Sequence, residues 1–378
     1  MAAAELLTFD PDGDLLLRLP YFAEQVEGEK RECGTDTETL LDDAAADRLD
    51  GAMTPEEEFD ELMEEAGTAS EIHMLVSSKH LMLASPVFRA MLQYSNFKEG
   101  DELRKNGRVE VALPDDNYIA FGIMMDIIHG RVSKIPRRVS LEILTNMSIL
   151  VDKYETVELF GLILNVWIPF LEKSLPQSFN SDVLPWLSIA WVFRLPEHFR
   201  KMTGLLQSVA DGTKQEILAD TLPIPSRVFE KIEMWRQGTI LKALEPIEKF
   251  FSDCQSPKGV CLGSARSELI VACNGMMFGT FLRSASAQKI WPLPSYPFHG
   301  LRVLEVTKRI RSLGIKSICS NTFQEHKVSY ITHLVDTSKS HGYNELFVDK
   351  MAKIEGTLSG LGLESFLSQS KHPEVQPA

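Results

Sequence analysis

Four residues in the C-terminal half have side chains that zinc prefers, namely Cys254, Cys261, Cys319 and His326. Cysteine thiolates and histidine nitrogens are the usual ligands of a tetrahedral structural zinc ion. In each pair the two residues are separated by six others, whereas ordinary zinc-finger pairs have about two to five. Structural zinc is therefore one interpretation. The competing interpretation is that these cysteines are buried free thiols, as cysteines often are.

Motifs of catalysis are absent from the sequence. It contains no phosphate-binding glycine-rich loop, no nucleophile elbow and no His-Glu-x-x-His motif. Asp10, Asp12 and Asp14 alternate as in a calcium loop, but Gly13 stands at the fourth position of that loop instead of the sixth. Three further histidines are expected at the surface or at helix caps: His299, His333 and His341. We therefore predict a protein that is not an enzyme.

The net charge of −14 is concentrated in one stretch of the chain. Between Glu24 and Glu65 there are 17 acidic and 3 basic residues, and the rest of the chain is balanced. Because few apolar side chains accompany these charges, residues 20–70 cannot bury enough surface to offset the entropy of ordering. We predict a long disordered acidic insertion here. Nucleic-acid binding is not expected, since no basic face remains.

One segment inside this insertion has the pattern of a short helix. Thr54 stands at the N-cap, Pro55 at the first helical position, and Glu57 completes a capping box. Three apolar side chains then share one face and are candidates for docking onto a partner: Phe59, Leu62 and Met63. One alternative is that this helix packs on its own domain, and another is a solvated run of charge with a transient helix.

The cellular setting is indicated by three features. The first residues, MAAAELLTFD, lack the charged start and long apolar run of a signal peptide. No stretch reaches the roughly 18 unbroken apolar residues that a membrane span needs. The five cysteines are an odd number, which favours reduced thiols. We expect an intracellular protein, in the cytoplasm, the nucleus or both, with no membrane partner.

The elements that position these residues can be predicted in the N-terminal half. Stretches near 14–19, 71–76 and 108–113 alternate apolar and polar residues as strands do. Amphipathic helices lie between and after them. Asp115-Asp116 is expected to cap one helix and Ser140 the next. Ser95 to Gly107 is interpreted as a loop. The pattern predicts an α+β domain in which helices flank a small sheet.

Beyond about residue 175 the pattern is helical and interrupted by prolines. A long helix is predicted from Ser226 towards Phe250, and others over 301–314 and about 325–337. Residues 252–300 are rich in turn residues and include WPLPSYPFHG, in which the prolines exclude regular structure. Residues 176–378 are therefore expected to form a mainly α-helical C-terminal region.

The N-terminal half contains five notable stretches: DGDLLLRL (12–19), VSSKHLMLASPVFRAML (76–92), GRVEVALPDD (107–116), FGIMMDIIHGR (121–131) and VSLEILTNMSILVDKYETVELF (139–160). Taken together, they resemble a BTB (also called POZ) domain of the type common in filamentous fungi. The resemblance implies a small three-stranded sheet capped by helical hairpins over residues 12–175. Residues 1–11 would be an N-terminal tail, and the acidic insertion would separate the first two strands. The family's usual His-Lys at the strand-to-helix corner is inverted here as Lys79-His80.

The resemblance implies protein binding. Some such domains bind a cullin scaffold and recruit substrates for ubiquitination, and these carry a hydrophobic-x-Glu signature after the second helix. Phe97-Lys98-Glu99 stands at that place here. An exposed Phe97 would enter a groove on the partner, with Glu99 orienting it. Alternatively, Phe97 folds back onto Leu92 or Leu103 and Glu99 is an ordinary surface charge.

Homodimerisation is left open by the sequence. Many domains of this family dimerise, but they use an additional N-terminal helix and strand, and only MAAAELLTFD precedes the domain here. The leading hypothesis is an intracellular adaptor or scaffold that binds other proteins. Its more specific form is the recruitment of substrates to a cullin-type ubiquitin ligase. The alternative is a transcription- or chromatin-associated scaffold that acts through the acidic segment without direct DNA binding. Apart from structural zinc, no cofactor is expected.

Overall fold

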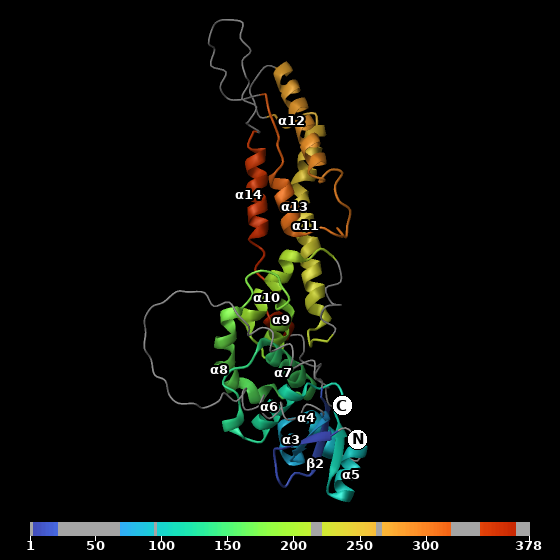
Figure 1. Cartoon of the computed structure of the whole chain (residues 1–378). Helices are drawn as coiled ribbons and strands as arrows, with labels where there is room; N and C mark the ends of the chain where they lie inside the picture. Colours follow the sequence, from blue (N-terminus) through green and yellow to red (C-terminus); the bar gives the residue numbers. More distant parts are fainter. Residues whose placement is uncertain are drawn as a thin grey trace, which may run out of the picture. The chain divides into compact units, whose positions relative to one another are not determined.

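The computed structural model shows an α+β fold with a small mixed sheet and otherwise mostly helices (Figure 1). The chain divides into two compact units. The first contains Met1–Leu175 and Ser188–Arg194, and the second contains Pro176–Leu187 and Leu195–Ala378. The chain thus leaves the first unit after Leu175, near the predicted boundary, and returns to it briefly over Ser188–Arg194. The described residues are 3–21, 69–93, 97–212, 221–261, 267–318 and 341–367.

The sheet of the first unit contains four strands in the order β1-β3-β2-β4. The central strands β2 and β3 are antiparallel, β1 is parallel to β3, and β4 is parallel to β2. Leu15, Leu17 and Leu19 alternate inward from β2 and are buried. The alternation therefore predicts this strand and its buried face correctly. The strands are β1 (Ala3–Thr8), β2 (Leu15–Pro20), β3 (Ala69–Val76) and β4 (Val109–Ala112).

The first strand was not predicted. Residues 1–11 were interpreted as a tail, but Ala3–Thr8 pairs with β3 along the edge of the sheet. The amides of Phe9 and Asp10 both donate to the carbonyl of Leu75 and hold the end of the strand. Its sequence, AAELLT, has no clean alternation, so its extended form depends on the partner strand and not on local preference.

Helices surround the sheet of the first unit, and their ends follow capping rules. Asn117 caps α6 by accepting from the Ala120 amide at 2.9 Å, and Ser140 caps α7 by accepting from the Ile143 amide at 3.1 Å. The predicted cap Ser140 is confirmed. The predicted cap Asp115-Asp116 is wrong by one residue, because Asn117 caps α6. The helices are α3 (Ser78–Ala84), α4 (Pro86–Gln93), α5 (Lys98–Asn106), α6 (Tyr118–Ile128), α7 (Leu141–Tyr154) and α8 (Gly161–Leu171).

Asp116 does not cap a helix because its carboxylate is used inside the unit. It is buried and accepts from Lys153 Nζ at 2.6 Å and from the Tyr154 hydroxyl. Burial, followed by the nearby Asp116 charge, raises the pKa of Tyr154 well above its ordinary value. The Tyr154 ring also stacks on Phe88, with ring centroids 4.6 Å apart. Tyr154, at the end of α7, therefore connects α4 with the loop before α6.

The segment predicted as a loop over 95–107 contains helix α5. Its first turn has Glu99 and Asp101 and its last turn has Arg104 and Lys105. This charge order suits the helix dipole. Gly107 then ends the helix with φ +71°, a conformation that glycine adopts without strain. The helix has almost no apolar stripe, which explains why the periodicity of the sequence did not predict it.

In the second unit the helices enclose a core of their own. The long helix α11 packs against α13 and α14, and α12 runs alongside it (Figure 1). Phe250 lies at the centre, with its ring centroid 4.8 Å from that of Phe281 and 4.7 Å from that of Tyr343. The second unit contains α10 (Pro196–Val209), α11 (Ser226–Gln255), α12 (Ser267–Ala287), α13 (Val303–Arg311), α14 (Tyr343–Glu355) and α15 (Glu364–Leu367), and α9 (Val183–Val192) spans both units.

Helix α12 corrects the prediction for residues 252–300. That stretch was interpreted as rich in turns, yet it contains a helix of 21 residues, Ser267–Ala287. Gly275 and Gly279 lie inside it, and interior glycines lower the helix preference of a sequence. Cys273, Met277 and Phe281 point into the core at helical spacing and outweigh that cost. The predicted helix over 301–314 is confirmed as α13, and the one over 325–337 lies outside the described residues.

Candidate interaction surfaces and a thiol–imidazole cluster

Phe97 is exposed at the start of α5. Its backbone is extended, with φ −121° and ψ 144°, and its carbonyl accepts from the Asp101 amide at 3.3 Å. Half of the Phe97 residue surface is exposed, so the ring is not folded away into the core. Glu99 is the more covered of the two, with a side chain 19% exposed and 3.8 Å from Lys98 Nζ. The structure thus presents the aromatic ring and partly covers the carboxylate.

A second apolar surface lies on α8 and was not predicted from the sequence. Leu162, Val166 and Phe170 follow one another at intervals of four and are 83%, 54% and 38% exposed. The opposite face, with Trp167 among its residues, is buried. No charged residue occurs in GLILNVWIPFL, the sequence of this helix. A helix that is apolar on all sides is typically covered on all sides. The lack of charged residues in α8 is therefore the sequence signal from which a second interaction surface could have been predicted.

The basic residues next to this surface contact its aromatic ring. The Arg138 guanidinium lies 4.7 Å from the Phe170 ring centroid, and Lys173 Nζ lies 5.5 Å from it. Both distances are within the range of cation–π attraction. We call the exposed side chains of Leu162, Val166 and Phe170 the α8 stripe. It is bordered by positive charge at the Phe170 end.

In the second unit two thiols and one imidazole converge. Cys261 Sγ lies 3.7 Å and Cys273 Sγ 3.5 Å from the same nitrogen, His341 Nε2. One ligand atom from each residue lies within 4.8 Å of the others. Cys273 is buried on α12, and the other two are half-buried. We call these three residues the thiol–imidazole cluster. It contains His341, which was expected at the surface or at a cap.

The cluster differs from the four-residue zinc set predicted from the sequence. Of that set, Cys261 alone belongs to the cluster, and Cys319 and His326 lie outside the described residues. Cys254 is a free thiol at the end of α11. Burial, and then the charge of Asp253, raise the pKa of Cys254 to about 12. Its thiol therefore stays protonated at neutral pH, which makes it a poor metal ligand.

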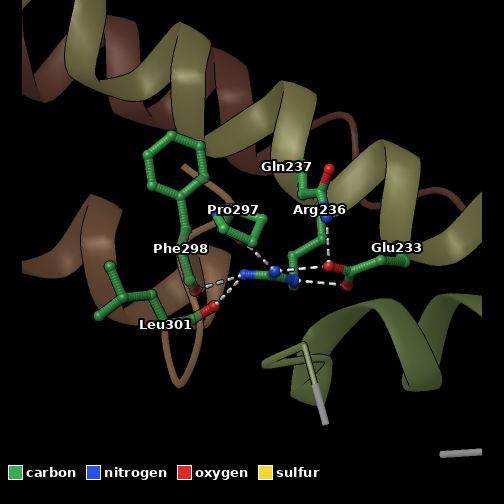
Figure 2. A network of polar contacts seen from close by, with 6 residues as sticks. All are labelled: Glu233, Arg236, Gln237, Pro297, Phe298 and Leu301. Atoms are coloured by element: carbon green, nitrogen blue, oxygen red, sulfur yellow. Dashed lines mark hydrogen bonds and ion pairs between the residues drawn. The ribbon is translucent and has the colours of Figure 1, made fainter. Parts of the chain in front are cut away.

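A buried arginine in the same unit is saturated by the protein itself. Arg236 is fully buried on α11, and Figure 2 shows its guanidinium between Glu233 and the turn at Pro297, Phe298 and Leu301. Nε and Nη2 donate to the Glu233 carboxylate at 2.7 and 2.6 Å. The remaining donors reach the three carbonyls of the turn at 2.8 to 2.9 Å. All five guanidinium donors are used, so Arg236 fixes a turn and has no donor left for a ligand.

The charge of Arg236 also determines the ionisation of its partner. Burial acts to raise the pKa of Glu233, but hydrogen bonds from Arg236 and Gln237 and the arginine charge lower it below its ordinary value. Glu233 is therefore an anion at neutral pH. The ion pair is partly screened, because the Glu233 side chain remains one-third exposed.

The other predicted partner-binding residues are not part of the described structure. Phe59, Leu62 and Met63 lie outside the described residues, as does nearly all of the acidic insertion. Among the helices that the structure describes, none combines the length and apolar character that crossing a bilayer requires. Comparison of the chain with family models, with curated proteins and with solved structures finds no match.

Proposed function

We propose that the protein is an adaptor whose N-terminal unit is a BTB-type interaction module. The observation that carries the proposal is Phe97, a half-exposed aromatic residue at the N-cap of α5, with Glu99 two residues further on. Exposed aromatic residues are favoured as anchors at protein interfaces because they bury a large rigid surface at a small entropic cost. The partner we propose for this surface is a cullin-type scaffold.

The sheet of the first unit supports the family resemblance. The antiparallel pair β2 and β3, with β4 parallel to β2, corresponds to the small sheet that the resemblance implies, and helices α3 to α7 flank it. The additional edge strand β1 enlarges that sheet without interrupting it. These features agree with a module built for binding, in which the core residues hold the fold and the surface residues select the partner.

An adaptor needs a second surface, because it must hold its scaffold and its cargo at the same time. The α8 stripe offers one that shares no residue with Phe97-Glu99. Three large apolar side chains on successive turns of a helix match the spacing that helix-in-groove recognition uses. We assign cargo binding to this stripe and scaffold binding to Phe97.

The test is a pull-down of the full chain with a purified cullin scaffold. The variants are Phe97→Ala/Glu99→Ala, and Leu162→Glu as a substitution on the other proposed surface. The proposal predicts that the double variant loses the scaffold and that Leu162→Glu keeps it. Equal retention of the scaffold by the wild type and both variants, or by none of the three chains, would contradict scaffold binding through Phe97.

A further inference from the structure

We propose that the thiol–imidazole cluster of Cys261, Cys273 and His341 is a zinc-binding site. This site belongs to the second unit and is independent of the proposed adaptor surfaces. Two thiolates and a neutral imidazole are a ligand set that zinc prefers over calcium or magnesium, which select oxygen. Two thiolates would also balance the charge of a divalent ion, so a half-buried site would carry no net charge once the metal is bound.

The distances within the cluster agree with tetrahedral zinc. With Zn–S of about 2.3 Å and Zn–N of about 2.0–2.1 Å, the sulfur and nitrogen ligands of a tetrahedron lie about 3.6 Å apart. In the structure, His341 Nε2 lies 3.7 Å from Cys261 Sγ and 3.5 Å from Cys273 Sγ. The two sulfurs lie within 4.8 Å of each other, which includes the roughly 3.8 Å of a tetrahedral pair.

A cluster of hydrogen-bonded thiols explains the geometry less well. Each nitrogen of a neutral imidazole has either one lone pair or one proton, so it makes one well-aligned hydrogen bond in either tautomer. Two sulfurs nevertheless lie near the same nitrogen, His341 Nε2. At most one of these contacts can be a well-aligned hydrogen bond, whereas a metal ion at the centre binds all three ligand atoms at once.

The backbone around Cys261 is held in place by the neighbour of Cys273. Asn274 Oδ1 accepts from the amides of both Val260 and Cys261 at 2.8 Å. Gly259, with φ +64°, lies so close to the Asn274 side chain that a Cβ there would overlap it. Cys273 and Asn274 therefore act together, since one provides a thiol and the other fixes the segment that provides the second thiol.

The third ligand is placed by the start of another helix. His341 has a left-handed backbone, with φ +53°, and precedes Gly342, the N-cap of α14. This turn brings the imidazole to α12 from a point 68 residues away in the sequence. The three protein ligands leave one position of a tetrahedron for water or another donor. A bound zinc would tie together the segment after α11, the N-terminal half of α12 and the start of α14.

The site can be tested by metal retention on the full chain. The reduced, metal-free protein is incubated with Zn²⁺, freed of unbound metal by gel filtration, and analysed by mass spectrometry for zinc. The proposal predicts about one Zn²⁺ per chain for the wild type and for Cys254→Ser, a matched control whose thiol lies outside the cluster. Cys261→Ser and His341→Ala are expected to retain less than about one-fifth as much, because each removes one ligand of three.

Two further measurements separate loss of the site from loss of the fold. Circular dichroism of His341→Ala should match the wild type, and His341→Cys should retain zinc, since a thiolate replaces the imidazole. Titration with Co²⁺ should give a sulfur-to-cobalt charge-transfer band in the wild type and Cys254→Ser, but not in Cys261→Ser. Wild-type zinc in a folded His341→Ala chain, or a wild-type chain that retains no zinc, would overturn the proposal.

Discussion

The backbone amide of Ser77 donates a hydrogen bond to His129 Nε2 at 3.1 Å, across 52 residues of sequence. His129 Nδ1 lies 2.9 Å from the carbonyl of Met125, so the neutral tautomer with the proton on Nδ1 makes both contacts. The adjacent Ser78 is bound through its amide and hydroxyl to the Asp14 carboxylate, both at 2.7 Å. The corner between β3 and α3 is thus fixed from two sides, by Asp14 just before β2 and by His129 at the C-cap of α6.

This corner is predicted to loosen in acid. Burial lowers the pKa of His129 below the ordinary value of 6.5, and the charge of His80, whose ring centroid lies 5.1 Å away, also lowers it. Because the folded state disfavours the proton, the unfolded state binds more protons as the pH falls below 6.5, and stability is lost in that range. Protonation of Nε2 also removes the acceptor for Ser77.

Hydrogen exchange provides the measurement for the His129 corner. After correction for the intrinsic pH dependence, protection of a peptide that contains the Ser77 amide should fall between pH 7 and pH 5 in the wild type. His129→Gln should lower the protection at pH 7 and flatten this dependence. His73→Gln serves as the control, since His73 lies on β3 beside Glu71 and does not contact the corner. If protection of this peptide in the wild type did not change between pH 7 and pH 5, the proposed acid sensitivity of the His129 corner would be contradicted.

Replacing Arg236 with Met is expected to destabilise the second unit by about 2–4 kcal/mol, because a buried cation is removed and the partly exposed Glu233 loses its partner. Three carbonyl oxygens of the turn also lose their donors. Arg200→Met is the matched control. Arg200 pairs with Glu197 at the surface at 3.2 Å, so a change within about 0.5 kcal/mol is expected there. Urea unfolding measures both, and equal effects would show that the Arg236 network contributes no more than a surface pair.

Gly360 is predicted to tolerate no side chain. It has φ +75°, and a Cβ at this position would overlap the carbonyl of Arg200 on α10. Gly360→Ala should therefore cost about 2–4 kcal/mol, from backbone strain and a steric overlap together. Gly300→Ala isolates the strain, because Gly300 has φ +72° and open space around it, and about 1 kcal/mol is expected. A Gly360→Ala variant as stable as Gly300→Ala would refute the close approach of Gly360 to the Arg200 carbonyl.

Removal of zinc is predicted to lower the thermal stability of the second unit. Since a metal that binds the folded state alone stabilises it by mass action, a zinc chelator should lower the Tm of the zinc-loaded wild type and of Cys254→Ser by several degrees. His341→Ala should melt at the lower temperature with or without the chelator. Differential scanning calorimetry measures the shift. A chelator effect of equal size in His341→Ala would place the relevant zinc elsewhere.

Local sequence pattern predicts the parts of this fold that depend on local preference. The alternation of Leu15, Leu17 and Leu19 predicts β2, and Ser140 predicts the start of α7, because both signals act within a few residues. Helix α5 is missed because its apolar content is nearly limited to Leu103, and its stabilising signal is the order of its charges. Strand β1 is missed because it is extended only where it pairs with β3.

The candidate sites also differ in whether local sequence or tertiary packing determines them. Phe97 is selected because Phe97-Lys98-Glu99 matches the hydrophobic-x-Glu signature that the resemblance implies, and the structure shows its side chain half exposed; its role in binding stays a prediction. The thiol–imidazole cluster is not, since Cys273 and His341 are 68 residues apart and meet only through the packing of the second unit. Zinc motifs are recognised in sequences by short spacings, and neither Cys261 to Cys273 nor Cys273 to His341 has one.

Direct binding of the full chain to a purified cullin scaffold tests the proposed function most directly. Isothermal titration calorimetry would compare the wild type with Phe97→Ala/Glu99→Ala and with Val132→Ala, which removes an exposed apolar side chain elsewhere on the first unit. Because a central aromatic anchor contributes about 2 kcal/mol or more to binding, the double variant should bind about 30-fold more weakly or worse, and Val132→Ala should bind like the wild type. Equal affinity of the double variant and the wild type, or no binding by the wild type, would contradict the proposal.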